Sequence, residues 1–192
     1  YLKGHSARVS LYTGEIASVM ALKPSDVVLF SQAGMLHDLG KLVIMDNILL
    51  KPRQLTEEEF ELIRSHPVVG DKILKPLRFL SCEAKAVRHH HERYDGKGYP
   101  DGLKGEDIPF IARVVTVADA FDAMTSDRPY RLKRPVEAAV AEVIRGARTQ
   151  FDPLVAEAFV TIPIARLAEI SRHFDPRSAG APVAAAQPLV AH

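Results

Sequence analysis

The sequence predicts an all-α protein, and three observations lead to that fold class. Apolar residues recur at helical spacing in several segments, for example between Val9 and Met20. Serine, threonine and proline, which favour helix starts, precede several of these segments. No stretch alternates apolar and polar residues in the way that a β-strand would. We therefore expect a helical bundle with one long loop at about residues 94–108.

The first predicted helices lie in the N-terminal half of the chain. The apolar residues of the first are Val9, Tyr12, Ile16, Val19 and Met20. Pro24 stops this helix, and Ser25 is the expected N-cap of a second helix that ends near Gly40. Thr56 and Glu59 have the spacing of a capping box, which predicts a further helix with an acidic first turn.

Serine and proline also mark the starts of the later helices. Ser81 is expected to cap a helix that leads into three consecutive histidines, His89–His91. Pro109 lies in the first turn of an apolar helix that extends to Met124, because the fixed φ of proline suits that position. Two more helices are expected to begin at Pro135 and Pro153.

The composition is that of a folded domain. Hydrophobic residues make up 47% of the 192 residues and charged residues 26%, so a core can form. We expect one domain over residues 1–176 and a disordered tail, poor in charge and rich in Ala and Pro, over residues 177–192. A formal net charge of +1 gives no overall field to attract a nucleic-acid polymer or a membrane.

Features of the chain also bear on its location. The single cysteine, Cys82, excludes an internal disulfide and fits a reducing compartment. No apolar run approaches the roughly 18 residues of a membrane span, and no signal peptide is visible, so we expect a cytoplasmic protein. Because the chain begins at Tyr1 rather than Met, we expect a segment of a longer protein, without its N-terminal regulatory domain.

Imidazoles and carboxylates gather near the predicted helix ends. They belong to His5, His37, Asp38, His66, His89, His90, His91, Asp119 and Asp122. Such ligands suit iron, manganese or zinc, and the lack of thiolates argues against a structural zinc knuckle. Each piece alone also has a simple structural interpretation, as a helix cap, a helix start or a solvated helix end. Asp119 differs because a carboxylate in an apolar helix needs partners or a metal, whereas Asp122 can share its face or be exposed.

Five segments together resemble a known family. They are Gly4-His5, HDLGK (residues 37–41), SHP (65–67), HHERYDGKGYP (90–100) and VADAFDAMTSDRPYR (117–131). In their order, spacing and residue identity they are similar to the HD-GYP phosphodiesterase domain, over roughly residues 3–160. The resemblance implies an all-α, HD-type bundle with a long GYP loop that hydrolyses the bacterial messenger cyclic di-GMP at a site with several metal ions.

The resemblance also implies roles for individual residues. The implied metal ligands are His37, Asp38, His66, His90, His91 and Asp119, with Asp38 bridging two ions, and His89 falls outside the set. Lys41 is expected near the scissile phosphate, as a catalytic and substrate-binding residue, and Asp38 is expected to be catalytic as well as a ligand. The other expected substrate contacts are Tyr99 in the GYP loop, Arg128 and Arg131.

One departure from the family pattern concerns the number of ions. Members with three metals carry a glutamate four residues before the first-helix histidine, where this chain has Tyr1. A phenol with a pKa of about 10 is a poor ligand for a hard cation. We therefore expect two divalent ions, of which iron and manganese are the favoured candidates, and leave the ligand role of His5 open.

The ligand set suits phosphodiester hydrolysis. Two ions about 3.5–4 Å apart can activate a shared water as hydroxide and neutralise charge in an in-line displacement. The expected product is linear pGpG, with further cleavage to GMP left open. One alternative is a phosphohydrolase for another nucleotide, such as a mixed cyclic dinucleotide, and another is a non-catalytic module that responds to cyclic di-GMP. The GYP loop can contact the substrate or a partner such as a diguanylate cyclase domain, or it can be an ordinary turn.

Overall fold

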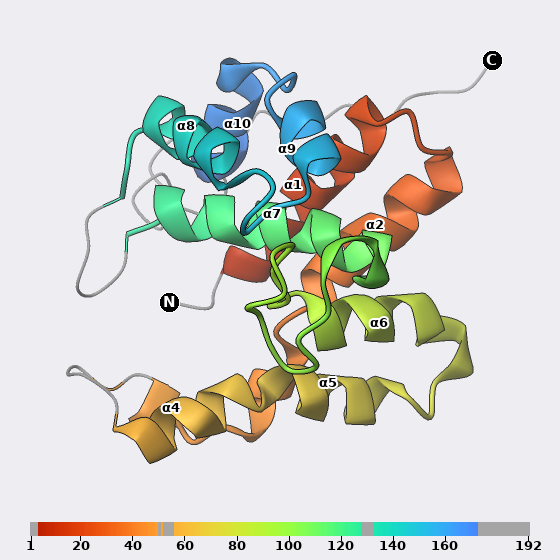
Figure 1. Cartoon of the computed structure of the whole chain (residues 1–192), viewed down its shortest axis with the longest axis vertical. Helices are drawn as coiled ribbons and strands as arrows, with labels where there is room; N and C mark the ends of the chain where they lie inside the picture. The colour runs from red at the N-terminus through yellow and green to blue at the C-terminus, as the bar shows by residue number, and fades with distance from the viewer. Residues whose placement is uncertain (1–3, 50, 52–55, 128–132, 173–192) are drawn as a thin grey trace, which may run out of the picture.

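The computed structural model describes residues 4–49, 51, 56–127 and 133–172 (Figure 1). Every regular element in these ranges is a helix, so the predicted all-α class is confirmed. The α-helices are α1 (His5–Val19), α2 (Pro24–Leu36), α3 (Asp46–Leu49), α4 (Glu57–Arg64), α5 (His66–Leu74), α6 (Ser81–His89), α7 (Phe110–Thr125), α8 (Val136–Gly146), α9 (Pro153–Phe159) and α10 (Ile164–Arg172). Short 3-10 helices are η1 (Leu39–Val43), η2 (Arg78–Leu80) and η3 (Gly105–Asp107).

Helix α7 runs through the middle of the molecule, with α8, α9 and α10 on one side and α4, α5 and α6 on the other (Figure 1). The main core forms where α7 packs against α1 and α9. There the ring of Phe121 lies between those of Tyr12 and Phe159, at centroid distances of 5.0 and 4.9 Å. Burial of each such ring contributes about 1.5–3 kcal/mol. Because α1 and α7 both carry candidate site residues, this packing fixes one side of the site.

A smaller apolar cluster joins α5 and α6, and two glycines bring η1 against it. The cluster is formed by Leu74, Ala84 and Val87. A Cβ on Gly40 would lie 1.9 Å from the carbonyl oxygen of His66, and one on Gly70 would lie 2.5 Å from Cγ1 of Val87. Only glycine fits at Gly40, so η1 can approach the start of α5 and place Asp38 beside His66.

The helix starts agree with the sequence at some positions and differ at others. Thr56 and Glu59 form the predicted capping box at the start of α4. Ser25, the predicted N-cap of α2, instead lies inside this helix, because Pro24 occupies the first helical position. Ser81 likewise is the first residue of α6 rather than its cap, because η2 leads directly into the helix.

The ends of two elements bear on the site. The predicted end of the second helix near Gly40 is wrong, since α2 ends at Leu36 and the chain then turns through His37 and Asp38 into η1. The predicted long loop between α6 and α7 is confirmed and contains η3. Tyr1, Arg128, Arg131 and the segment 177–192 lie outside the described residues. Among the described helices, none has both the length and the apolarity needed to cross a membrane.

Candidate metal centre

Three imidazoles are oriented in the same way by the last turns of three helices. The Nδ1 atoms of His37, His66 and His90 lie 2.7, 2.7 and 2.8 Å from the carbonyl oxygen three residues earlier in the chain. Those carbonyls lie in the last turns of α2, α4 and α6. A carbonyl only accepts, so each Nδ1 carries a proton, and each Nε2 is the nitrogen left to face a ligand.

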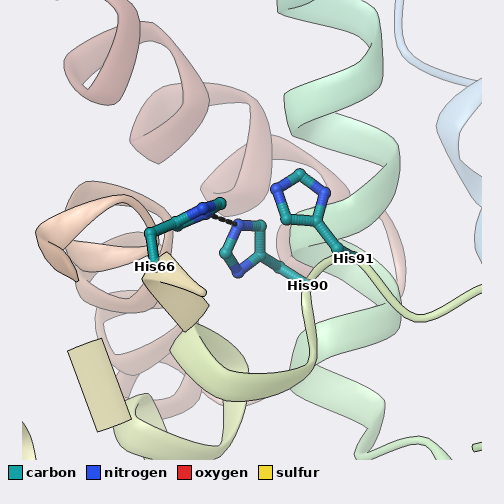
Figure 2. A group of neighbouring side chains, drawn as sticks. All are labelled: His66, His90 and His91. Carbon is teal, nitrogen blue, oxygen red and sulfur yellow. Dashed lines mark hydrogen bonds between the residues drawn. The ribbon is translucent and has the colours of Figure 1, made fainter. Parts of the chain in front are cut away.

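These Nε2 atoms converge on one buried region. His66 and His90 turn toward each other, with His91 beside His90 (Figure 2). The Nε2 atoms of His66 and His90 are 3.2 Å apart, and the Nε2 atoms of His5 and His37 are 3.3 Å apart. Burial lowers the pKa of His90, as do the neighbouring imidazoles of His91 and His37, so this ring stays neutral and able to bind a cation.

The carboxylate of Asp38 lies between two groups of imidazoles. Oδ1 is 3.3 Å from Nε2 of His66, and Oδ2 is 3.4 and 3.6 Å from Nε2 of His37 and His5. Burial raises the pKa of Asp38, but the neighbouring His37, His5 and His66 together outweigh burial and hold it well below its usual value. Oδ1 is buried and has no hydrogen-bond partner among the described residues. A buried, ionised oxygen without a donor is what a bound cation would satisfy.

His5 is held by side chains rather than by the main chain. Its Nδ1 is 2.7 Å from Oδ2 of Asp122, and Nε of Arg8 donates to Oδ1 of Asp122 at 2.6 Å. Burial lowers the pKa of His5, but the hydrogen bonds to Asp122 and Asp38 raise it to about 9. The Nε2 atom faces Oδ1 of Asp119 at 3.4 Å. His5, whose ligand role the sequence leaves open, therefore points into the cluster.

Arg8 is a site residue that the sequence does not indicate, and Asp122 is one whose position the sequence leaves open. Asp122 is 1% exposed, which resolves the alternatives of a buried or an exposed position. The available signal is spacing, since His5 and Arg8 are three residues apart, as are Asp119 and Asp122, so each pair shares one face of its helix. The sequence does not indicate which face of α1 meets which face of α7.

His91 is positioned by ring contacts. The Tyr99 ring stacks on it at a centroid distance of 4.8 Å and an interplanar angle of 25°. Burial lowers the pKa of His91 to about 3, with a further contribution from His66. The guanidinium of Arg64, at the end of α4, lies 4.7 Å from the Tyr99 centroid. The sequence reasoning did not single out Arg64, because the contact joins two segments that are separate in the chain.

The GYP loop is fastened beside the cluster by a buried carboxylate. Glu92 is 1% exposed, and its oxygens accept hydrogen bonds from the backbone N–H groups of Asp101 at 2.8 Å and Leu103 at 3.1 Å. A Cβ on Gly98 would lie 2.3 Å from the backbone nitrogen of Arg93, so the loop folds back closely on its own start. Tyr99 is thereby presented to His91.

The remaining predicted residues also have defined positions. Nζ of Lys41 is 2.7 Å from Oδ2 of Asp38, at the edge of the cluster. His89 points elsewhere, with Nδ1 3.4 Å from Oδ2 of Asp101, a carboxylate that Arg88 also binds. A cavity of about 440 Å³ opens beside the cluster. Its wall includes Lys41, Tyr99, Asp119, Thr116 and Gln150.

The donor set fits divalent metal ions. Two groups, His66/His90/His91 and His5/His37/Asp119, each have ligand atoms within 4.8 Å of one another, and a third joins Asp38 to His37 and His90. In metal sites the second ring nitrogen of a ligating imidazole typically donates a hydrogen bond to a carbonyl or a carboxylate oxygen. His37, His66 and His90 do the former and His5 the latter.

A helical domain with this histidine and aspartate cluster defines an HD-type metal-site protein, and comparison with known proteins agrees. The HD domain family model matches residues 1–155, so the chain belongs to the HD domain family. The predicted resemblance to the HD-GYP group is likewise confirmed.

Similar proteins carry related names. A cyclic di-GMP phosphodiesterase response regulator of Xanthomonas campestris is 41% identical over 90% of this chain and 46% of its own length. A cyclic di-GMP phosphodiesterase of Thermotoga maritima is 42% identical over 82% of this chain and 44% of its length. A 3'3'-cGAMP-specific phosphodiesterase of Vibrio cholerae is 39% identical over 80% and 33%. The chain thus spans less than half the length of these relatives.

Solved structures agree on the fold. A cyclic GMP-AMP-specific phosphodiesterase of Vibrio cholerae superimposes with a TM-score of 0.65 at 21% identity, covering 88% of this chain and 47% of that one. An HD-GYP-type protein of Bdellovibrio bacteriovorus gives a TM-score of 0.68 at 20% identity, covering 84% and 52%. At such identities the likeness shows the fold alone.

Proposed function

We propose that this chain is a metal-dependent phosphodiesterase domain that hydrolyses cyclic di-GMP to linear pGpG. The observation that supports it most is the position of Asp38, whose two oxygens face separate groups of imidazoles. A carboxylate so placed can bridge two cations. The substrate class rests on the relatives, several of which are named cyclic di-GMP phosphodiesterases.

In this proposal two divalent ions, iron or manganese, bind the cluster. The ligands are His37, Asp38, His66, His90, His91 and Asp119, with His5 as a further candidate. When bound, the ions supply Lewis acidity, which lowers the pKa of water and neutralises phosphate charge. The protein contributes orientation, because hydrogen bonds fix the imidazoles before any ligand arrives, and burial removes competing water.

Residues around the cluster would bind the substrate. Lys41 lies beside Asp38 on the cavity wall, where its ammonium can meet a phosphate oxygen. Tyr99 offers a ring for contact with a base or ribose. Arg128 and Arg131 complete the proposed phosphate contacts, and they lie outside the described residues. Residues 1–176 form the proposed catalytic domain, in the cytoplasm, and the GYP loop is a candidate contact for a diguanylate cyclase domain.

Loss of ligands tests this function. In metal-loaded protein, His37→Ala and Asp38→Ala should reduce hydrolysis of cyclic di-GMP to background and lower the bound metal per chain. His89→Ala is the matched control, since His89 points away from the cluster, and it should keep both. Circular dichroism would verify that each variant is folded. Turnover by the wild type no faster than by Asp38→Ala would contradict the proposal.

A second candidate substrate is another cyclic dinucleotide. It is favoured by the 39% identity to a relative named as specific for 3'3'-cGAMP. Rates of the wild type on cyclic di-GMP, 3'3'-cGAMP and cyclic di-AMP would separate the candidates. Tight binding of cyclic di-GMP without hydrolysis of any of the three would instead favour a non-catalytic signalling module.

A further inference from the structure

The turn between α8 and α9 contributes to the cavity wall, far from the metal cluster in sequence. Gln150, in this turn, lines the cavity together with residues of the cluster. Two backbone hydrogen bonds join the turn to the GYP loop. The backbone N–H of Tyr94 donates to the backbone carbonyl oxygen of Gln150 at 3.2 Å, and the backbone N–H of Asp95 donates to the backbone carbonyl oxygen of Thr149 at 2.8 Å. The loop and the turn therefore form one continuous wall.

The turn is held rigidly at both ends. The backbone N–H of Gln150 donates to the oxygen of Gly146 at 2.9 Å. A Cβ on Gly146 would lie 2.7 Å from the ring of Phe151, which is itself 2% exposed in the main core. A binding residue on a fixed backbone loses little conformational freedom when a ligand binds.

Neighbouring polar side chains on this wall already have partners. The Glu92 carboxylate accepts two backbone N–H groups, and Nε and Nη2 of Arg93 donate to Asp95 at 3.1 and 2.8 Å. The Thr116 hydroxyl donates to the His90 oxygen at 2.8 Å. The side-chain amide of Gln150, in contrast, makes no hydrogen bond to any described residue, and its atoms are not sealed from solvent. Its donors and its acceptor remain available.

We propose that Gln150 is a substrate-binding residue that hydrogen-bonds the edge of one purine base of the cyclic dinucleotide. This inference rests on the proposed function. An amide offers two N–H donors and one acceptor oxygen. It can complement adenine, which presents a donor at N6 beside an acceptor at N1, and guanine, which presents an acceptor at O6 beside a donor at N1. Gln150 therefore accommodates either purine.

Changing this amide to a carboxylate should make the choice of base one-sided. Gln150→Glu provides acceptors only, which pair with the N1–H and N2–H groups of guanine but not with N1 of adenine. The added charge slows both substrates alike, so the ratio of kcat/KM for cyclic di-GMP to that for cyclic di-AMP is the readout. We expect this ratio to rise about tenfold, the effect of one unmade hydrogen bond. Gln32→Glu, on the exposed surface of α2, is the matched control and should leave it unchanged.

Each outcome decides between the two proposals. If the wild type hydrolyses cyclic di-GMP but the ratio of kcat/KM values is the same in Gln150→Glu and Gln32→Glu, the role of Gln150 is overturned and the proposed function stands. No hydrolysis by the metal-loaded wild type would overturn the proposed function and this inference with it. If Gln150→Glu fails to fold, Gln150→Leu replaces it. That variant should raise KM for both substrates about three- to tenfold with little change in kcat, and an unchanged KM would contradict the inference.

Discussion

The imidazoles of the cluster are oriented by two different parts of the molecule. His37, His66 and His90 each donate to a carbonyl three residues earlier, so their own helix ends orient them. His5 donates to Asp122, which lies 117 residues away in the chain and also binds Arg8. One group depends on local geometry, and the other depends on the packing of α1 against α7.

This difference determines how each side can fail. The main-chain hydrogen bonds persist as long as the helices end where they do, and no single side-chain substitution removes them. The orientation of His5 depends on the buried carboxylate of Asp122, which binds both the Arg8 guanidinium and the His5 imidazole. Loss of Asp122 should therefore affect stability as well as ligand orientation, whereas changes near the other imidazoles should have smaller effects.

The largest expected effect is that of Asp122→Ala. Removing one partner of a buried ion pair costs about 3–5 kcal/mol, so we expect a loss of that size in the free energy of unfolding, measured by chemical denaturation of the metal-free protein. Glu142→Ala is the control, because this glutamate pairs with Arg134 and Arg145 at the surface and should cost about 0–1 kcal/mol. Equal losses in the two variants would contradict the importance of the buried pair.

Gly40→Ala should disturb the side oriented by the main chain. The new Cβ would meet the His66 oxygen and force η1 away from α5, at a cost of about 1–3 kcal/mol for overpacking. Because Asp38 precedes η1, the variant should also bind less metal per chain, as measured by elemental analysis after dialysis. Wild-type stability together with a full metal content would show that η1 can shift freely.

Thr116→Val tests the support behind His90. The single hydroxyl proton of Thr116 has two acceptors within 2.8 Å of its oxygen, the carbonyl oxygens of His90 and of Ala112 within its own helix. The nearly isosteric valine should cost about 1 kcal/mol and lower metal affinity several-fold, because the chain at His90 loses an anchor. Thr125→Val is the control on the same helix, since the Thr125 hydroxyl donates to the Phe121 oxygen and lies beside Tyr12 in the main core, and its metal affinity should match the wild type. Equal metal affinities in the two variants would show that Thr116 does not support His90.

Arg64→Met should have the smallest effect. It removes the cation near Tyr99 while keeping most of the side-chain volume, and a cation–π contact at a partly exposed site is worth about 0.5–1 kcal/mol. We expect KM for cyclic di-GMP to change about two- to fivefold with kcat nearly constant. Arg145→Met is the control. Arg145 pairs with Glu142 at the end of α8, as Arg64 pairs with Glu61 at the end of α4, and its loss should leave KM unchanged. Identical KM values would show that Arg64 does not position Tyr99.

The sequence predicts best those features that depend on local geometry. Histidines near helix ends are recognisable from the spacing of the apolar residues, even where the exact end differs, and the structure brings His37, His66, His90 and His91 together as the motifs predict. Asp119 also joins the cluster, as expected of a carboxylate in an apolar helix. The capping box of α4 is a purely local signal, and it is confirmed.

Features that depend on contacts between distant segments could not be predicted. The Asp122 pair with Arg8 requires the rotation of α1 against α7, and the approach of Arg64 to Tyr99 requires the placement of α4 beside the GYP loop. Gln150 lines the cavity from the α8–α9 turn, which backbone hydrogen bonds join to that loop. The end of α2 was misplaced for a related reason, since Gly40 serves close packing on α5 rather than helix termination.

Anomalous X-ray diffraction from metal-loaded crystals, recorded at the absorption edge of the bound metal, tests the central claim most directly. We expect peaks within ligand distance of both Asp38 oxygens, one shared with His66 and His90 and the other with His37. A loaded crystal whose only peaks lie away from these residues, for example beside His89 and Asp101, would contradict it.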